Sequence, residues 1–79
     1  MKNELKDIKL LMDAGILAKA TVTNSPMFGG WTVDFDGKKK GEGYGLYTQR
    51  GELRAFKSLD AACKVIKELG FAEFAVKPQ

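Results

Sequence analysis

The stretch Trp31-Thr32-Val33-Asp34-Phe35-Asp36 has the clearest pattern in the chain. Its apolar residues at positions 31, 33 and 35 alternate with polar residues at 32, 34 and 36. Successive side chains of a β-strand point to opposite faces, so the alternation predicts a strand with one buried face and one wet face. A single strand is not stable alone, so the flanking sequence must supply partner strands and a covering layer.

Four more stretches are predicted strands: residues 18–23, 44–49, 52–57 and 71–76. Segments 24–30 and 37–43 are rich in glycine and other turn residues, and are predicted loops. Arg50-Gly51 predicts a tight turn in which Gly51 has a positive φ. Leu53 and Phe56 fall on opposite faces of their strand, which indicates a bulge or an early departure of Phe56 from the ladder.

Residues 3–14 and 58–69 are predicted amphipathic helices, with Asn3 and Ser58 as N-caps and Gly15 and Gly70 just beyond the last turns. Their apolar stripes are Leu5, Ile8, Leu11 and Met12, then Leu59, Ala62, Cys63, Ile66 and Leu69. The order α-β-β-β-β-α-β predicts an α+β two-layer sandwich, an antiparallel sheet with both helices on one face. The other face is then open to solvent or to a partner.

Length and composition indicate one small globular domain over residues 1–79, because the chain is 44% hydrophobic and too short for a second core. The apolar runs are too short to span a membrane, and the first residues show no secretory signal. The single cysteine, Cys63, excludes an intramolecular disulfide. A free thiol fits a reducing compartment, so we expect a cytoplasmic protein.

The sequence offers little for catalysis, because it contains no histidine and so no histidine base or metal ligand. Cys63 lies on a predicted buried stripe, where thiols are usually inert. Asp34 and Asp36 share the wet face of their strand, as solvated carboxylates commonly do. The glycines of segment 41–45 precede a strand rather than a helix, unlike a phosphate-binding loop. We expect no enzyme, no catalytic residue, no cofactor and no metal.

The positive charge is concentrated in the middle of the chain. The formal net charge is +3, but residues 38–67 hold eight basic and three acidic side chains, a net +5. Clustered cations suit a phosphate backbone, whereas scattered lysines could equally well only solvate a small domain. The predicted nucleic-acid contacts are Lys38, Lys39, Lys40, Arg50 and Arg54.

Aromatic and apolar residues suggest a second kind of interface. Tyr44 and Tyr47 fall on opposite faces of their strand, so one should leave the core and lie beside Arg54. Met27 and Phe28, between Pro26 and two glycines, could close one end of the core or form a partner-binding lip. Phe28 and Tyr47 are therefore predicted partner-binding residues. The alternative function is a protein-interaction module or homodimer without nucleic-acid binding.

The segment from Thr48 to Phe71 carries a T-Q-R-G turn, an R-A-F-K-S-L-D-A-A entry into a helix and an L-G-F exit. Together with Trp31-Thr32-Val33, these elements resemble small plasmid-encoded partition-associated proteins of the ParC type, over about residues 30–76. The resemblance implies a non-enzymatic cytoplasmic accessory protein in the maintenance of a plasmid or mobile element. Its partner would be DNA or another partition or maintenance protein.

Residues Trp31 to Gly45 also look like the second strand, turn and G-x-G stretch of double-stranded RNA-binding domains. The chain departs from that family after this point. A whole additional hairpin precedes the second helix, which opens with Ser58-Leu59-Asp60 instead of a lysine-rich turn. The lysines with which that family binds phosphate are therefore missing, and we interpret the likeness as convergence.

Overall fold

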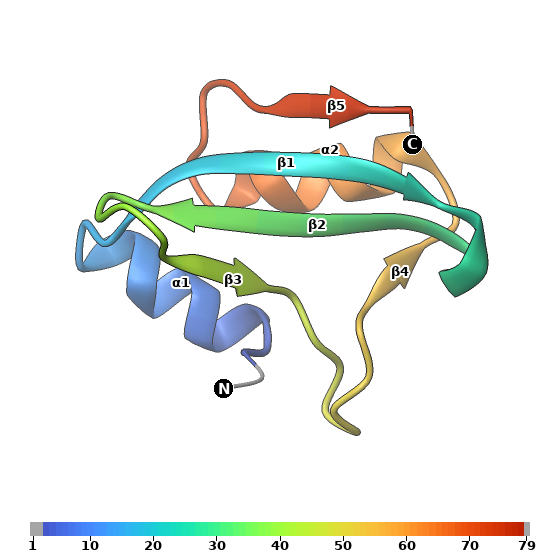
Figure 1. Ribbon diagram of the computed structural model, residues 1–79, viewed down its shortest axis with the longest axis horizontal. Coiled ribbons are helices and arrows are strands. Elements are labelled where there is room, and N and C mark those ends of the chain that lie inside the picture. Colours follow the sequence, from blue (N-terminus) through green and yellow to red (C-terminus); the bar gives the residue numbers. More distant parts are fainter. Residues whose placement is uncertain (1–2, 79) are drawn as a thin grey trace.

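The computed structural model describes residues 3–78, which form two helices and one five-stranded sheet in two layers (Figure 1). This confirms the predicted α+β class. The elements are α1 (Leu5–Asp13), β1 (Leu17–Ser25), the 3-10 turn η1 (Pro26–Phe28), β2 (Gly30–Gly37), β3 (Gly43–Gly45), β4 (Ala55–Phe56), α2 (Leu59–Glu68) and β5 (Ala75–Lys77).

The sheet is mixed, so the prediction of an all-antiparallel sheet is wrong for one strand. β2 pairs antiparallel with β1, β3 and β4, but β5 runs parallel to β1, with Val22 opposite Val76. The helix α2 carries the chain back across the sheet before β5 begins, and such a crossover is what a parallel pair needs. The predicted strand 71–76 is also displaced toward the C-terminus. Phe71 is instead a core residue, whose ring centroid lies 5.8 Å from that of Phe35.

The predicted strands 44–49 and 52–57 are mostly outside the sheet. Of these stretches only β3 and β4 join the sheet, where they pair with the two ends of one edge of β2. Residues 46–54 project between them as a hairpin (Figure 1). This 46–54 hairpin contains the bridge Tyr47–Leu53 and the predicted turn at Gly51, where φ is 84°. Asn3 pairs with Leu46, so the chain just before α1 takes a place beside β3 that the sequence did not indicate.

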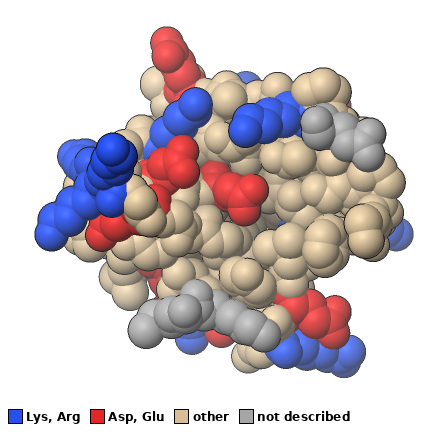
Figure 2. Space-filling model, viewed as in Figure 1, with Lys and Arg blue, Asp and Glu red and all other residues tan. Residues whose placement is uncertain are grey.

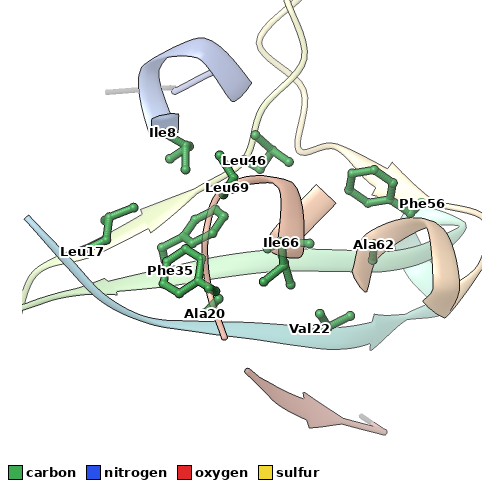
Figure 3. Close-up of a cluster of buried hydrophobic side chains, with 12 residues drawn as sticks. Ile8, Leu17, Ala20, Val22, Phe35, Leu46, Phe56, Ala62, Ile66 and Leu69 are labelled. Atoms are coloured by element: carbon green, nitrogen blue, oxygen red, sulfur yellow. The ribbon is translucent and has the colours of Figure 1, made fainter. Parts of the chain in front are cut away.

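One hydrophobic cluster joins the two layers. Phe35 of β2 and Val22 of β1 pack with Ile8 of α1 and Ile66 of α2 (Figure 3). Both helices therefore cover the same face, as predicted. Figure 3 also shows Leu46 beside Ile8, so the beginning of the 46–54 hairpin is anchored in the core although most of it projects away.

The predicted helix ends are confirmed with one correction. Both helices close with a Schellman motif: Ile16 N–H donates to Leu11 O at 3.0 Å, and Phe71 N–H donates to Ile66 O at 3.4 Å. The glycines at these ends, 15 and 70, have φ of 74° and 105°.

Ser58 caps α2 as predicted, because its hydroxyl accepts the Ala61 N–H at 3.1 Å. Asn3 does not cap α1. The N-cap is Glu4, whose N–H donates to the Asp7 carboxylate at 2.9 Å. Asn3 is only 5% exposed and pairs with Leu46 of the 46–54 hairpin. The predicted N-cap is therefore one residue too early.

Candidate functional site

The three consecutive lysines lie in the loop of residues 37–43, between β2 and β3, and are exposed as predicted. Hydrogen bonds order this loop. Glu42 N–H donates to Lys39 O at 3.2 Å, and Lys39 N–H donates to a Glu42 carboxylate oxygen at 3.3 Å. The Glu42 carboxylate therefore offsets part of the positive charge and also holds the loop in shape. Lys39 and Lys40 remain as cations presented to solvent.

Lys38 has a structural role that the sequence does not indicate. Its N–H donates to Ile16 O at 2.9 Å, which ties the 37–43 loop to the end of α1. Its Nζ lies 3.8 Å from where a Cβ on Gly15 would be, beside the C-terminal end of that helix. Helix C-termini carry a partial negative charge, so a lysine there stabilises the helix. Lys38 is thus less available to an external ligand than Lys39 and Lys40.

A second basic group lies at the other end of α1. A hollow of about 560 Å³ separates the beginning of this helix from the 46–54 hairpin. We call it the α1 hollow. It is lined by Glu4, Leu5, Lys6, Lys9, Tyr47, Thr48, Gln49 and Arg54. Three cations and one carboxylate give this lining a net charge of +2.

Arg54 is positioned by an aromatic ring. Its guanidinium carbon lies 4.8 Å from the centroid of Phe56, a cation–π contact that fixes the head group at the edge of the core. Within residues 3–78, neither Arg54 nor Lys6 or Lys9 forms an ion pair. The Glu4 carboxylate in the lining therefore offsets only part of the positive charge of the α1 hollow.

The sequence indicates Arg54 as a site residue but gives no such indication for Lys6 and Lys9. These lysines belong to the exposed side of a helix, which is ordinarily a solvated surface. Their meeting with Arg54 depends on the pairing of Asn3 with Leu46, because that contact brings the beginning of α1 against the hairpin. No local sequence signal marks this pairing.

The five predicted nucleic-acid contacts do not form one surface. The loop carrying Lys38 to Lys40 and the turn carrying Arg50 project from different corners of the sheet (Figure 1). Arg50 is exposed and does not line the α1 hollow, whereas Arg54 does. The helix α1 connects the two basic groups, with the lysine loop near its end and the hollow near its beginning.

The open face of the sheet is acidic at its centre. Its central side chains include Asp34 and Asp36, and Figure 2 shows acidic atoms in the middle of this face with basic atoms around them. Burial raises the pKa of the Asp34 carboxyl above its ordinary 3.8, Asp36 raises it further, and Lys77 lowers it. A polyanion laid across this face would meet two carboxylates.

The tyrosines lie in different surroundings, but not on the two faces of one strand as predicted, because β3 ends at Gly45. Tyr44 shares the helix-covered face of the sheet with Phe35, its partner across the β2–β3 ladder, and packs against the core. Tyr47 lies over Gly45, where a Cβ would be 3.0 Å from its ring, and lines the α1 hollow together with Arg54. Tyr47 therefore lies at the β3 edge beside α1, rather than out on the open face.

Met27 and Phe28 do not close the core, so that interpretation is wrong. They form the 3-10 turn between β1 and β2 and are 95% and 55% exposed. A β-hairpin tip projects past the end of the sheet, which leaves these side chains without a layer to pack against. Phe28 lies at the β1–β2 tip and Tyr47 in the 46–54 hairpin, so the two predicted partner-binding residues belong to different surfaces (Figure 1).

Within residues 3–78 no three acidic or cysteine side chains gather into a metal-binding group. Cys63 is half-buried at the surface of α2, rather than fully buried as the stripe suggested. Neither helix in the described part of the chain is long and apolar enough to cross a membrane.

Comparisons with protein-family models, with curated proteins and with solved structures find no match to this chain.

Proposed function

We propose that this chain is a small non-enzymatic domain that binds nucleic acid through the phosphate backbone, along α1. Lys39 and Lys40 would contact phosphates near the end of the helix, and the cations of the α1 hollow would contact them near its beginning. The observation that carries the proposal is that both basic groups flank one helix, with their lysines exposed and Arg54 half-buried.

The spacing of the two groups supports a backbone contact. α1 has nine residues, so at 1.5 Å per residue it is about 13 Å long. A B-form strand presents a phosphate about every 3.4 Å along the duplex axis, so about four phosphates lie over that length. Cations at both ends of α1 can therefore contact one strand at two separate places.

The salt dependence of binding tests the proposal. Each phosphate contact releases counterions and adds about 0.9 to the slope of log affinity against log salt. Fluorescence anisotropy of labelled duplex and single-stranded DNA, from about 50 to about 200 mM salt, measures that slope. The double variant K39A/K40A should weaken binding uniformly across sequences and reduce the duplex slope by about 1.8.

The matched control is K64A/K67A, which removes the same charge from exposed positions of α2. The slope of log affinity against log salt should be nearly the same for this control as for the wild type, because its two lysines are on α2 and not beside α1. Equal losses in the two double variants would mean that only net charge matters, and no binding at about 50 mM salt would contradict the proposal outright.

The resemblance to ParC-type partition-associated proteins suggests a cellular role for this nucleic-acid binding. On that basis the domain would act in the cytoplasm, in plasmid or mobile-element maintenance, on DNA or beside another partition protein. Retention of a low-copy plasmid over many generations, with the wild-type or the K39A/K40A coding sequence, tests this step. Equal retention would contradict it.

A different observation favours a second candidate, self-association or protein binding through Met27 and Phe28. Two large apolar side chains that are 95% and 55% exposed on a short 3-10 turn are typical of a contact surface. Sedimentation velocity of the wild type and of M27S/F28S tests self-association. A concentration-dependent dimer that disappears in the variant supports this candidate. If both proteins are monomers, the turn does not mediate self-association.

A further inference from the structure

We infer that the α1 hollow binds a phosphate monoester, the terminal phosphate of a nucleic-acid strand. This inference rests on the proposed nucleic-acid function and deepens it, because it assigns the two basic groups different tasks. Lys39 and Lys40 would follow the internal phosphodiesters, while the hollow would receive the strand end.

The volume and the lining of the site suit a discrete ligand. The hollow of about 560 Å³ has two walls, one from α1 and one from the 46–54 hairpin. That volume falls within the range of small-molecule sites, about 300–1,000 Å³. The hollow is open to solvent, so a phosphate group can approach the donors of both walls from outside.

The donors come from both walls. Lys6 and Lys9 approach from α1 and Arg54 from the hairpin, and Arg54 offers a planar fork that matches two oxygens of one phosphate. Thr48 adds a hydroxyl: its oxygen accepts the Glu52 N–H at 3.3 Å, which leaves the hydroxyl proton for a ligand.

Charge favours a monoester over a diester. A terminal phosphate carries about −1.5 to −2 at pH 7 and presents three strong acceptor oxygens, whereas an internal diester carries one negative charge. The lining has three cations and the single carboxylate of Glu4, a net +2. A dianion therefore matches the charge of the hollow, while a diester would leave part of it uncompensated.

The test compares oligonucleotides of identical sequence with and without a 5′-phosphate or a 3′-phosphate, by anisotropy at one fixed salt concentration. The wild type should bind a phosphorylated end about tenfold more tightly, since a hydrogen bond between charged groups is worth at least that factor. The variants K6Q/K9Q and R54Q should lose this preference. K64Q/K67Q, with the same charge change on α2, should keep it.

Two kinds of variant, R54Q and K6Q/K9Q, separate a loss of phosphate binding from a loss of folding. Arg54 packs on Phe56, so R54Q could lower stability, but Lys6 and Lys9 are exposed on α1 and their replacement leaves the core untouched. Thermal unfolding of each variant confirms that it is folded at the temperature of the assay. A preference that survives in folded K6Q/K9Q would overturn the inference.

Equal wild-type affinity for phosphorylated and unphosphorylated ends would also overturn the inference. That result would leave the proposed function intact if K39A/K40A still flattened the salt dependence, so the two failures are distinguishable. Adenosine monophosphate and inorganic phosphate, added as competitors, identify the source of the phosphate. We expect both to compete weakly, because they lack the phosphodiesters for Lys39 and Lys40. Competition as strong as that of the phosphorylated oligonucleotide would contradict the strand-end assignment in favour of a free monoester.

Discussion

The guanidinium carbon of Arg54 lies 4.8 Å from the centre of the Phe56 ring. Phe56 belongs to β4 and is buried opposite Trp31 of β2, so this contact links a surface cation to the sheet. It gives Arg54 one preferred place at the rim of the α1 hollow, whereas a lysine there would be free to move. An arginine held in advance loses less conformational entropy when it binds an anion.

Replacing Arg54 by alanine should lower the free energy of unfolding by about 0.5–1 kcal/mol, because a half-exposed cation–π contact is lost. Urea unfolding followed by Trp31 fluorescence measures the change. Arg50→Ala, in the exposed turn of the same hairpin, is the control and should be neutral. Equal losses from the two replacements would mean that the Phe56 contact contributes nothing.

Replacing Ser58 by alanine should cost about 1 kcal/mol, since the Ala61 N–H loses its acceptor at the beginning of α2. Ser58→Asp keeps an acceptor and adds a favourable charge at the helix N-terminus, so it should be at least as stable as the wild type. Thermal unfolding measures both variants. A stable Ser58→Ala protein would show that the cap is not needed.

Two neighbouring glycines should respond very differently to alanine. A Cβ on Gly30 would overlap the backbone carbonyl of Phe56, so Gly30→Ala must push β4 away from β2 and should cost about 3 kcal/mol or more. Gly29 has no atom within 4 Å of such a Cβ, but its φ is 82°, so Gly29→Ala should cost only about 1 kcal/mol. Urea unfolding ranks the two variants, and the reverse order would contradict the observed packing of β4.

The raised pKa of Asp34 predicts a pH effect with a definite sign. The folded protein binds the Asp34 proton more tightly than the unfolded chain does, so this group favours folding at low pH. That contribution is lost as the pH rises through the folded pKa, which lies above 3.8. Asp34→Asn should therefore raise stability at pH 7.

Thermal unfolding midpoints of the wild type and Asp34→Asn at pH 3 and pH 7 measure this effect, and the gain should shrink at pH 3. Lys77→Ala is the complement, because it removes the charge that lowers the Asp34 pKa and should destabilise the protein at pH 7. A loss of stability at pH 7 in Asp34→Asn would contradict this account.

The parts of the fold that the sequence predicts are those determined by interactions between residues close together in the chain. The alternation of residues 31–36 predicts β2, and Ser58, Gly15 and Gly70 predict helix ends, because each signal acts within one turn or one strand. The choice of strand partner is different. Sequence alone could not show that β3 and β4 share one edge of β2, or that β5 joins β1 in parallel, because those pairings depend on the path of the whole chain.

The same distinction applies to the candidate site. Lys39 and Lys40 are adjacent in sequence and in a loop, so their exposure was predictable. The α1 hollow was not, because it brings Lys6 and Lys9 beside Arg54, more than forty positions later in the chain. Likewise, the alternation placed Asp34 and Asp36 on the open face, but only the register of β1 and β2 shows that they lie near its centre.

The most direct test of nucleic-acid binding along α1 is an amide chemical-shift titration of the labelled protein with a 5′-phosphorylated oligonucleotide at low salt. Binding along α1 predicts shifts in residues 4–9, 38–42 and 47–54, at both ends of that helix and not elsewhere. The amides of α2 and of the β1–β2 tip should remain unchanged. Shifts confined to Met27 and Phe28, or to the open face around Asp34, would contradict the account.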